Sequence, residues 1–267
     1  MPQPLQIAPA SGRLGILTPG MGAVASTAYA GVLAARQGLA VPIGSLTQMA
    51  HIRLGRREDG RNPLIRDFAP LAQLDDLVFG GWDPISPNAL EAARTAGVLE
   101  ERDLAPLSGE LEGINAMPAV FDQRWVKRLD GVRVKTGESK WDLAQQLIAD
   151  IQAFAETNGC DRLVAVWCGS TEVYREPTEV HASLAAFEQG LKDSDPDIAP
   201  SQIYAYAACL CYSLSHFGKL GLQAGLLRNS GQRRGATARD RKKRLKGLQQ
   251  LQMLRLASGS KLKLRAS

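Results

Sequence analysis

Residues 14–32 have the sequence LGILTPGMGAVASTAYAGV: a short apolar run, a glycine-rich turn and a helix of small residues. Gly20, Gly22 and Ala25 fit the G-x-G-x-x-A form of the dinucleotide-binding fingerprint. In that pattern the first glycine permits a tight turn, the second lets a diphosphate approach the backbone, and the small third residue lets helix and strand pack closely. The start of the helix offers unpaired N–H groups and a partial positive charge to phosphates. The stretch therefore predicts a nucleotide-binding βα unit, although an ordinary βα turn without a ligand also fits it.

One part of the fingerprint is missing from its usual place. A carboxylate about 20 residues after the glycines normally binds the ribose hydroxyls, but residues 38–47 contain no acid. We therefore expect such a carboxylate to come from another segment. Residues 76–83, DLVFGGWD, predict a strand that runs into a glycine turn, and Asp83 follows its carboxyl end, where open parallel sheets bind ligands. A turn or helix-capping aspartate is the alternative interpretation.

Helical and strand patterns alternate along the rest of the chain. Helices are predicted over residues 21–37, 87–97, 140–157, 178–191 and 199–210, and further strands over 13–18, 117–121 and 162–167. The run at 162–167 is almost continuously apolar, as expected for a strand covered on both faces, and it leads into a small polar turn. The alternation predicts an α/β domain with a Rossmann-like, doubly wound parallel sheet.

Composition argues against several classes of protein. No run of 18 apolar residues is present, so no membrane-spanning helix is predicted, and the first residues do not resemble a secretory signal. Four cysteines without a C-x-x-C pair and three scattered histidines predict reduced thiols in a cytoplasmic protein without a metal site. A basic loop at residues 53–61 is either a solvated loop or a contact for an anion.

Charge is distributed unevenly along the chain. Residues 211–267 carry 14 lysines and arginines and one acid, whereas residues 1–210 carry 18 basic and 26 acidic side chains. This asymmetry fits a tail that binds nucleic acid, and it also fits two parts of different origin. We favour an irregular, solvated basic tail, because it has few aromatic side chains for stacking. Within it, residues 244–256 predict a short amphipathic helix, and the last nine residues predict disorder.

Four motifs in a fixed order carry a resemblance to a known family. They are TPGMGAV at 18–24, GSLTQ at 44–48, VFGGWD at 78–83 and VWCGSTE at 166–172. With them, residues 12–208 resemble the N-terminal half of the myo-inositol-1-phosphate synthases (inositol-3-phosphate synthases), most of all the bacterial branch. The resemblance implies an N-terminal extension at 1–11, an NAD-binding Rossmann-like domain at 12–208 and a basic tail at 209–267.

The resemblance also implies a reaction. Enzymes of the family cyclise D-glucose 6-phosphate to 1D-myo-inositol 3-phosphate, in inositol and phospholipid biosynthesis. NAD takes a hydride from C5 of the sugar, the ketone acidifies C6, an enolate closes on the C1 aldehyde, and the hydride returns. The protein positions the reacting atoms and stabilises the enolate and alkoxide charge. NAD is therefore the expected cofactor, and glucose 6-phosphate is the family's substrate.

The family motifs imply which residues bind NAD. The candidates are Gly20, Met21, Gly22, Ala23, Val24, Asp83, Val120, Cys168, Gly169, Ser170 and Thr171. Residues 20–24 match the pyrophosphate-binding turn, Asp83 matches the carboxylate on the adenosine ribose, and Val120 matches an apolar residue near the adenine. Residues 168–171 match the small polar turn on the nicotinamide side. A small buried thiol is the alternative for Cys168, which we do not propose as a nucleophile.

The family's second half is not recognisable in residues 209–267. In the family, that half supplies the oligomer contacts, the substrate-phosphate site and the catalytic lysines. We assign no catalytic role to the lysines of the tail, which are Lys219, Lys242, Lys243, Lys246, Lys261 and Lys263. The texture of the tail resembles a shifted reading frame or a truncated gene, so we expect an inactive copy that keeps the cofactor half but lacks the family's homo-oligomer contacts. The alternative is a non-enzymatic nucleotide-binding protein with a tail that binds nucleic acid.

Overall fold

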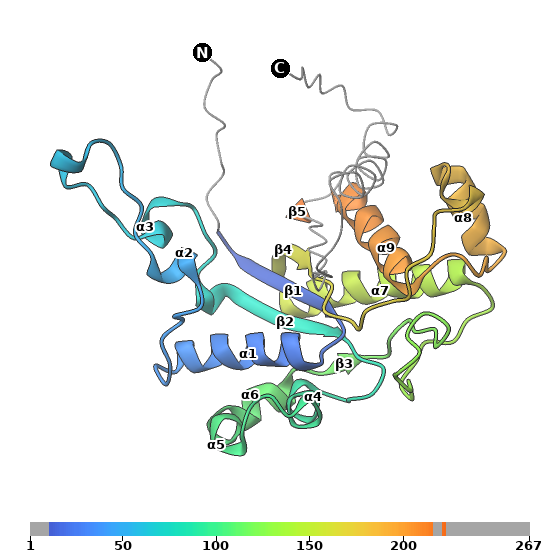
Figure 1. The fold of residues 1–267 in the computed structure, drawn as a ribbon, viewed down its shortest axis with the longest axis horizontal. Coiled ribbons are helices and arrows are strands. Elements are labelled where there is room, and N and C mark those ends of the chain that lie inside the picture. Colours follow the sequence, from blue (N-terminus) through green and yellow to red (C-terminus); the bar gives the residue numbers. More distant parts are fainter. Residues whose placement is uncertain (1–10, 216–220, 223–267) are drawn as a thin grey trace, which may run out of the picture.

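The computed structural model describes residues 11–215 and 221–222 (Figure 1). Its strands are β1 (Arg13–Pro19), β2 (Leu77–Trp82), β3 (Ala116–Met117), β4 (Cys160–Ala165) and β5 (Gly221–Leu222). They form one sheet in the order β3-β2-β1-β4-β5, and every pairing is parallel. The chain winds outward from β1 to β3, then crosses back to add β4 beside β1. The winding direction therefore changes between β1 and β4, which is where open sheets of this kind bind ligands.

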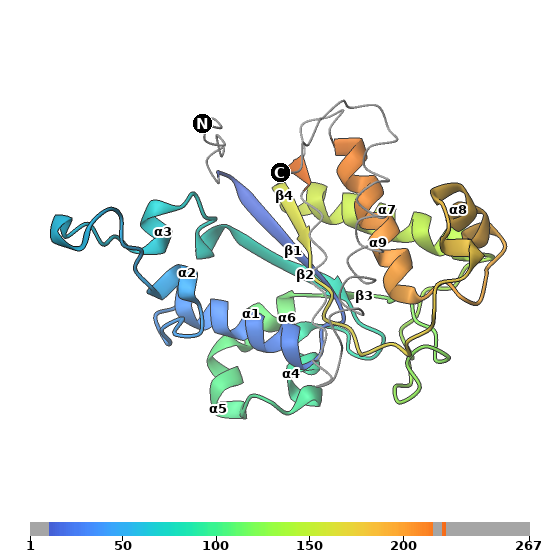
Figure 2. The ribbon, with the colours of Figure 1, turned by 45° about the horizontal axis from the view of Figure 1, so that its top comes forward.

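Helices cover both faces of the sheet, as predicted for a doubly wound fold (Figures 1 and 2). The helices are α1 (Ala23–Arg36), α2 (Leu46–Met49), α3 (Ile65–Phe68), α4 (Ala89–Ala96), α5 (Glu101–Leu104), α6 (Ser108–Gly113), α7 (Lys140–Asn158), α8 (Leu184–Lys192) and α9 (Pro200–Ser215). One large core cluster joins α1, α4, α5 and α6 on one face, and a second large cluster joins α7 and α9 to β1 and β4 on the opposite face. Within the described residues, none of these helices combines the length and the apolar character that crossing a membrane requires.

Helix α7 approaches the sheet closely because glycines leave room for its Phe154 ring. A Cβ added at Gly80 in β2 would lie 2.4 Å from Cε2 of Phe154, and one added at Gly15 in β1 would lie 2.9 Å from Cε1. Gly159 ends this helix in the left-handed conformation, with a φ of 57°, as the Asn-Gly pair in the sequence predicts.

Some predicted boundaries differ from the observed ones. The helix predicted over 178–191 is split into a 3₁₀ turn at Glu179–His181 and α8, because Ser183 caps a new helix by accepting the Ala186 N–H. The strand predicted over 117–121 ends at Met117, since Pro118 has no N–H to donate to a ladder. The helix predicted over 199–210 continues to Ser215 as α9, and the division of the chain into domains after residue 208 stays a prediction. The predictions for residues 1–10, 216–220 and 223–267, including the amphipathic helix and all of the tail lysines, lie outside the described residues.

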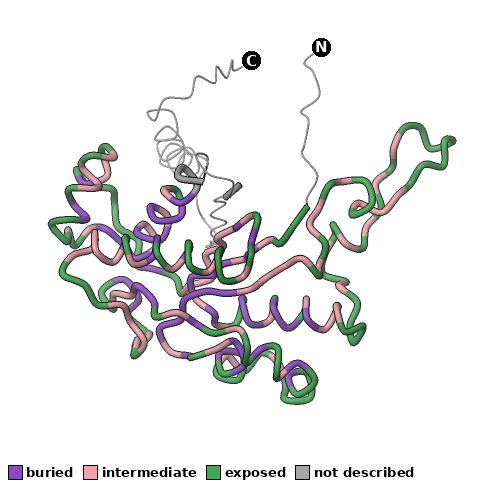
Figure 3. Tube along the Cα trace, turned by 180° about the vertical axis from the view of Figure 1, so that it is seen from behind, coloured by how far each residue is buried: buried purple, intermediate pink, exposed green. Residues whose placement is uncertain are grey.

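Residues 39–73 form an arm between α1 and β2 that extends away from the sheet (Figure 3). Pairing between Ile52 N–H and Pro63 O and between Leu54 N–H and Arg61 O closes its tip. The basic loop predicted at 53–61 lies in this tip and is mostly exposed. Several large apolar side chains of the arm are also exposed: Leu39, Val41, Ile43, Leu46, Met49 and Phe68. The arm leaves from the amino edge of the sheet, because it connects the end of α1 to the start of β2.

Candidate functional site

The turns after three strands meet at the carboxyl edge of the sheet. Beyond β4 the parallel pairing with β1 continues, because Val166 N–H donates to Leu17 O at 2.9 Å and Cys168 N–H donates to Pro19 O at 3.0 Å. On the other side of β1, Gly20 N–H donates to the carbonyl oxygen of Trp82 at 2.7 Å. The structure therefore brings the predicted segments 20–24, 83 and 168–171 to the same edge.

Gly20 is in direct backbone contact with the turn after β4. Its φ is 86°, a conformation that favours glycine. A Cβ added at Gly20 would lie 2.6 Å from Cα and 2.7 Å from N of Gly169, and backbone atoms cannot rotate out of the way. The two glycine-containing motifs, from strands on either side of the change in winding direction, thus form one structural unit.

The beginning of α1 is open and suited to an anion. No side chain caps the helix at Gly22, and its first turn contains no acid. No atom of the described residues lies within 4 Å of a Cβ added at Gly22, and Ala23 and Val24 are exposed. The first N–H groups of a helix have no intrahelical partner, and they attract negative charge. The geometry here fits the diphosphate of a dinucleotide.

Asp83 holds this edge together through backbone hydrogen bonds. The residue is buried, with 6% of its surface exposed. Its Oδ2 accepts the Met21 N–H at 3.0 Å, and its Oδ1 accepts the N–H groups of Ile85 and Ser86 at 2.9 and 2.7 Å. These hydrogen bonds show that Asp83 stabilises a turn, which is the alternative role that the sequence suggested for it. They also commit the Met21 amide to Asp83, so the amides left for a phosphate are those of residues 22–24.

Asp83 keeps some capacity for a further donor. A carboxylate offers about four acceptor positions, and three are used by backbone N–H groups. A ribose hydroxyl is a donor of the right kind for the remaining position. The structural role found here therefore does not compete with the predicted ribose contact, which stays a prediction.

Val120 is fixed by helix α9 on the opposite face of the sheet from α1. It is buried, and its N–H donates to the Tyr204 hydroxyl oxygen at 2.9 Å. The Tyr204 ring lies edge-on to Trp82 and Trp167, with centroid distances of 5.2 and 5.7 Å. Burial raises the pKa of Tyr204, so its phenol stays neutral. Val120 thus belongs to the same edge, linked to the other segments through one tyrosine.

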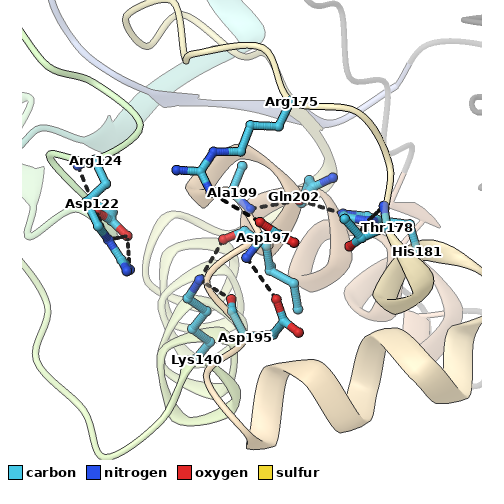
Figure 4. Close-up of polar contacts among 11 residues, drawn as sticks. Asp122, Arg124, Lys140, Arg175, Thr178, His181, Asp195, Asp197, Ala199 and Gln202 are labelled. Carbon is cyan, nitrogen blue, oxygen red and sulfur yellow. Dashed lines mark hydrogen bonds and ion pairs between the residues drawn. The ribbon is translucent and has the colours of Figure 1, made fainter.

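A cleft of about 310 Å³ lies beside Val120, between the loop 120–124 and the starts of α7 and α9. Its charged side chains are already engaged (Figure 4). Lys140 Nζ donates to Asp195 O at 2.6 Å and to Ile198 O at 2.7 Å, and Arg124 pairs with Asp122 at 2.6 Å. Burial lowers the pKa of Lys140. Lys140 therefore holds the loop before α9 in place. Its position at the start of a predicted helix did not indicate this role.

The turn at residues 168–171 presents mostly polar groups. Cys168 is partly buried, and burial raises the pKa of its thiol, which keeps it neutral and poorly nucleophilic. Ser170 and Thr171 are exposed at the edge. Within the described part of the chain, no group of three His, Cys, Asp or Glu side chains is placed to hold a metal ion.

Comparison with known proteins places this site in context. A model for the NAD-binding domain of myo-inositol-1-phosphate synthase matches residues 14–215. The chain is 49% identical over 205 residues to inositol-3-phosphate synthase 1 from Bacteroides thetaiotaomicron. This alignment covers 76% of this chain and 47% of that relative. It is 30% identical over 195 residues to inositol-3-phosphate synthase from Trypanosoma brucei brucei, covering 69% of this chain and 37% of the relative.

A solved structure shares the fold. The crystal structure of inositol-3-phosphate synthase from Caenorhabditis elegans superposes with a TM-score of 0.69 at 23% identity, covering 79% of this chain and 43% of that one. The chain spans less than half the length of the relatives it matches.

Proposed function

Because the chain belongs to the myo-inositol-1-phosphate synthase family, we propose that it binds NAD across the point between β1 and β4 where the winding direction changes. The cofactor is NAD, as the family model indicates. The observation that carries the proposal is the joined pair of turns, in which Gly20 meets Gly169 beside the open start of α1.

The edge offers a distinct surface to each part of the dinucleotide. We assign the diphosphate to the amides of residues 22–24 and the adenosine ribose to Asp83. The adenine then lies toward Val120, and the nicotinamide lies toward residues 168–171. The exposed Ala23 and Val24 leave room for the ligand, and no acid in the first turn of α1 repels its phosphates.

We further propose that this domain serves the conversion of D-glucose 6-phosphate to 1D-myo-inositol 3-phosphate, in inositol and phospholipid biosynthesis. NAD, when bound, supplies the capacity to accept and return a hydride. The residues of this chain bind and orient the cofactor. We infer that the 267-residue polypeptide does not complete the reaction alone, because the family's catalytic lysines have no recognisable counterpart in it. Among the described residues, the one lysine that lines the cleft is Lys140, and its Nζ already donates to two carbonyl oxygens.

Cofactor binding is tested by titrating the purified full chain with NAD while following its thermal unfolding. A ligand that binds only the folded state at 100 times its Kd stabilises that state by about 2.7 kcal/mol, so we expect a saturable rise in Tm. A folded chain whose Tm does not change up to millimolar NAD would contradict the proposed cofactor site.

The catalytic inference is tested separately. The full chain is incubated with glucose 6-phosphate and NAD, and inositol phosphate is measured by mass spectrometry. We expect none above the enzyme-free background. Formation of inositol phosphate would show that the tail supplies the missing groups after all.

A further inference from the structure

A buried carboxylate follows the predicted nicotinamide-side turn directly. Cys168 is held to β1 through Pro19 O, whereas residues 170–171 are exposed. The next residue, Glu172, is only 8% exposed. Its Oε1 accepts the Ser201 N–H at 2.8 Å, and its Oε2 accepts the Ser201 hydroxyl. Residues 170–171 therefore lie between two fixed points, the hydrogen bond from Cys168 to β1 and the hydrogen bonds from Ser201 to Glu172.

The partner of this carboxylate is the first turn of α9. Ser201 is the second residue of that helix, where N–H groups lack intrahelical partners and negative charge is favoured. Hydrogen bonds to an ionised acceptor are about twice as strong as neutral ones. The same helix carries Tyr204, which accepts the Val120 N–H. Helix α9 thus supports both ends of the proposed cofactor site.

The segment after Glu172 has anchors of its own (Figure 4). Val173 N–H donates to Trp125 O at 2.8 Å. The Arg175 guanidinium lies 4.6 Å from the centroid of the Trp125 ring and pairs with Asp197 at 3.1 Å. Loss of the Glu172 contact should therefore change the path of the exposed turn without releasing the whole segment.

We propose that Glu172 is a positioning residue for the nicotinamide end of the cofactor. By tying residue 172 to the start of α9, its carboxylate sets where the backbone and hydroxyl groups of residues 170–171 meet the dinucleotide. The proposed diphosphate site lies in the turn between β1 and α1, and that turn is held by Asp83 rather than by Glu172. This inference rests on the proposed function, and it requires Glu172 to act on one end of the cofactor only.

The experiment compares two ligands on the full chain by isothermal titration: NAD, and ADP-ribose, which lacks the nicotinamide. Glu172→Gln removes the charge at nearly constant size. Ser201→Ala removes the hydroxyl donor but keeps the N–H, and it provides a milder second variant if Glu172→Gln folds poorly. The control is Glu176→Gln, which changes an exposed acid of the same segment.

We expect Glu172→Gln to bind NAD about tenfold more weakly, equivalent to roughly 1.4 kcal/mol, and Ser201→Ala about fivefold more weakly, equivalent to roughly 1 kcal/mol. Their affinity for ADP-ribose should stay within about twofold, or ~0.4 kcal/mol, and Glu176→Gln should match the unchanged chain for both ligands. A purely structural defect would weaken both ligands alike.

The other outcomes separate the inference from the proposed function. Equal losses for both ligands, or no loss for either, would overturn the role of Glu172 and leave NAD binding intact. Equal affinity of the unchanged chain for NAD and ADP-ribose would overturn it too, because the nicotinamide would then contribute nothing. If the unchanged chain binds neither ligand, the proposed function fails, and the inference fails with it.

Discussion

Gly20 and Gly22 are two residues apart, but the structure requires each of them for a different reason. Gly20 has a φ of 86° and touches the backbone of Gly169, so the fold itself needs a glycine there. Gly22 has a negative φ of −62° and open space where a Cβ would be. The fold tolerates a side chain at Gly22, but the proposed diphosphate site does not.

Replacement of Gly22 by alanine should therefore separate binding from stability. We expect Gly22→Ala to keep its free energy of unfolding within about 0.5 kcal/mol of the unchanged chain while binding NAD at least about tenfold more weakly. Gly31→Ala, on the exposed side of α1, is the control, and it should stabilise the helix slightly without affecting NAD. Urea denaturation and NAD titration measure the two quantities. Unchanged NAD affinity in Gly22→Ala would remove the diphosphate from this turn.

Asp83 gives a second prediction at the scale of one residue. In Asp83→Asn the side-chain NH₂ group would face the Met21 N–H or those of Ile85 and Ser86, leaving at least one buried donor unpaired. We expect a loss of roughly 1–3 kcal/mol in the free energy of unfolding, measured by urea denaturation without ligand. Glu112→Gln, on the exposed surface of α6, should cost much less. An unchanged stability would mean that the carboxylate acts on the ligand alone.

At the scale of elements, much of the fold follows from local patterns. The apolar spacing of α7 and its stop at Asn158-Gly159 are visible in the sequence, and the structure confirms that helix and adds Ser139 as its N-cap. The split between Glu179–His181 and α8 was missed, because the Ser183 cap competes with a continuous apolar spacing. The fingerprint and the family resemblance predicted the motif glycines and Asp83 as cofactor-binding residues, and their role in binding stays a prediction.

Other parts of the site depend on contacts between distant segments. The close approach of Gly20 to Gly169, the hydrogen bond from Met21 N–H to Asp83 and the hydrogen bonds from Ser201 to Glu172 each join different segments of the chain. Periodicity and spacing describe one segment at a time, so they do not contain these partners. Glu172 lies inside a recognised motif, yet only the fold shows that its carboxylate is buried against α9.

The packing of α7 on the sheet yields a prediction for a pair of elements. A methyl group at Gly80 would overlap the Phe154 ring, and such overpacking typically costs 1–3 kcal/mol. We expect Gly80→Ala to lose roughly that much stability in urea, and Phe154→Leu in the same chain to recover part of the loss. Gly109→Ala, on the exposed side of α6, should show no such loss. Strictly additive effects of the two substitutions would mean that the ring is not what occupies this space.

At the scale of the whole molecule, the arm is the most exposed apolar feature of the described residues. Ile43 and Leu46 are 81% and 75% exposed, and large exposed apolar side chains gathered in one segment favour association. It lies at the amino edge of the sheet, away from the proposed cofactor site. Association through the arm and binding of NAD should therefore be separable.

We expect the purified chain to self-associate with rising concentration, and the double variant Ile43→Asp, Leu46→Lys to do so less. Sedimentation velocity over a range of concentrations measures the effect. Val98→Asp, which changes an exposed apolar residue elsewhere, is the control for a general gain in solubility. A compact monomer at every concentration of the unchanged chain would contradict the prediction.

The contacts between the carboxyl edge of the sheet and α9 also affect when this edge can fold during translation of the chain. Trp82, Val120 and Glu172 all find partners on this helix, yet it is among the last described parts of the domain to leave the ribosome. Until Ser201 and Tyr204 have emerged, a nascent chain holds most of the sheet, but the carboxyl edge that we propose as the cofactor site lacks its contacts with α9. This edge is thus among the last described regions to become native during translation, and a release that occurs before Pro200 would yield strands and helices without a competent cofactor surface.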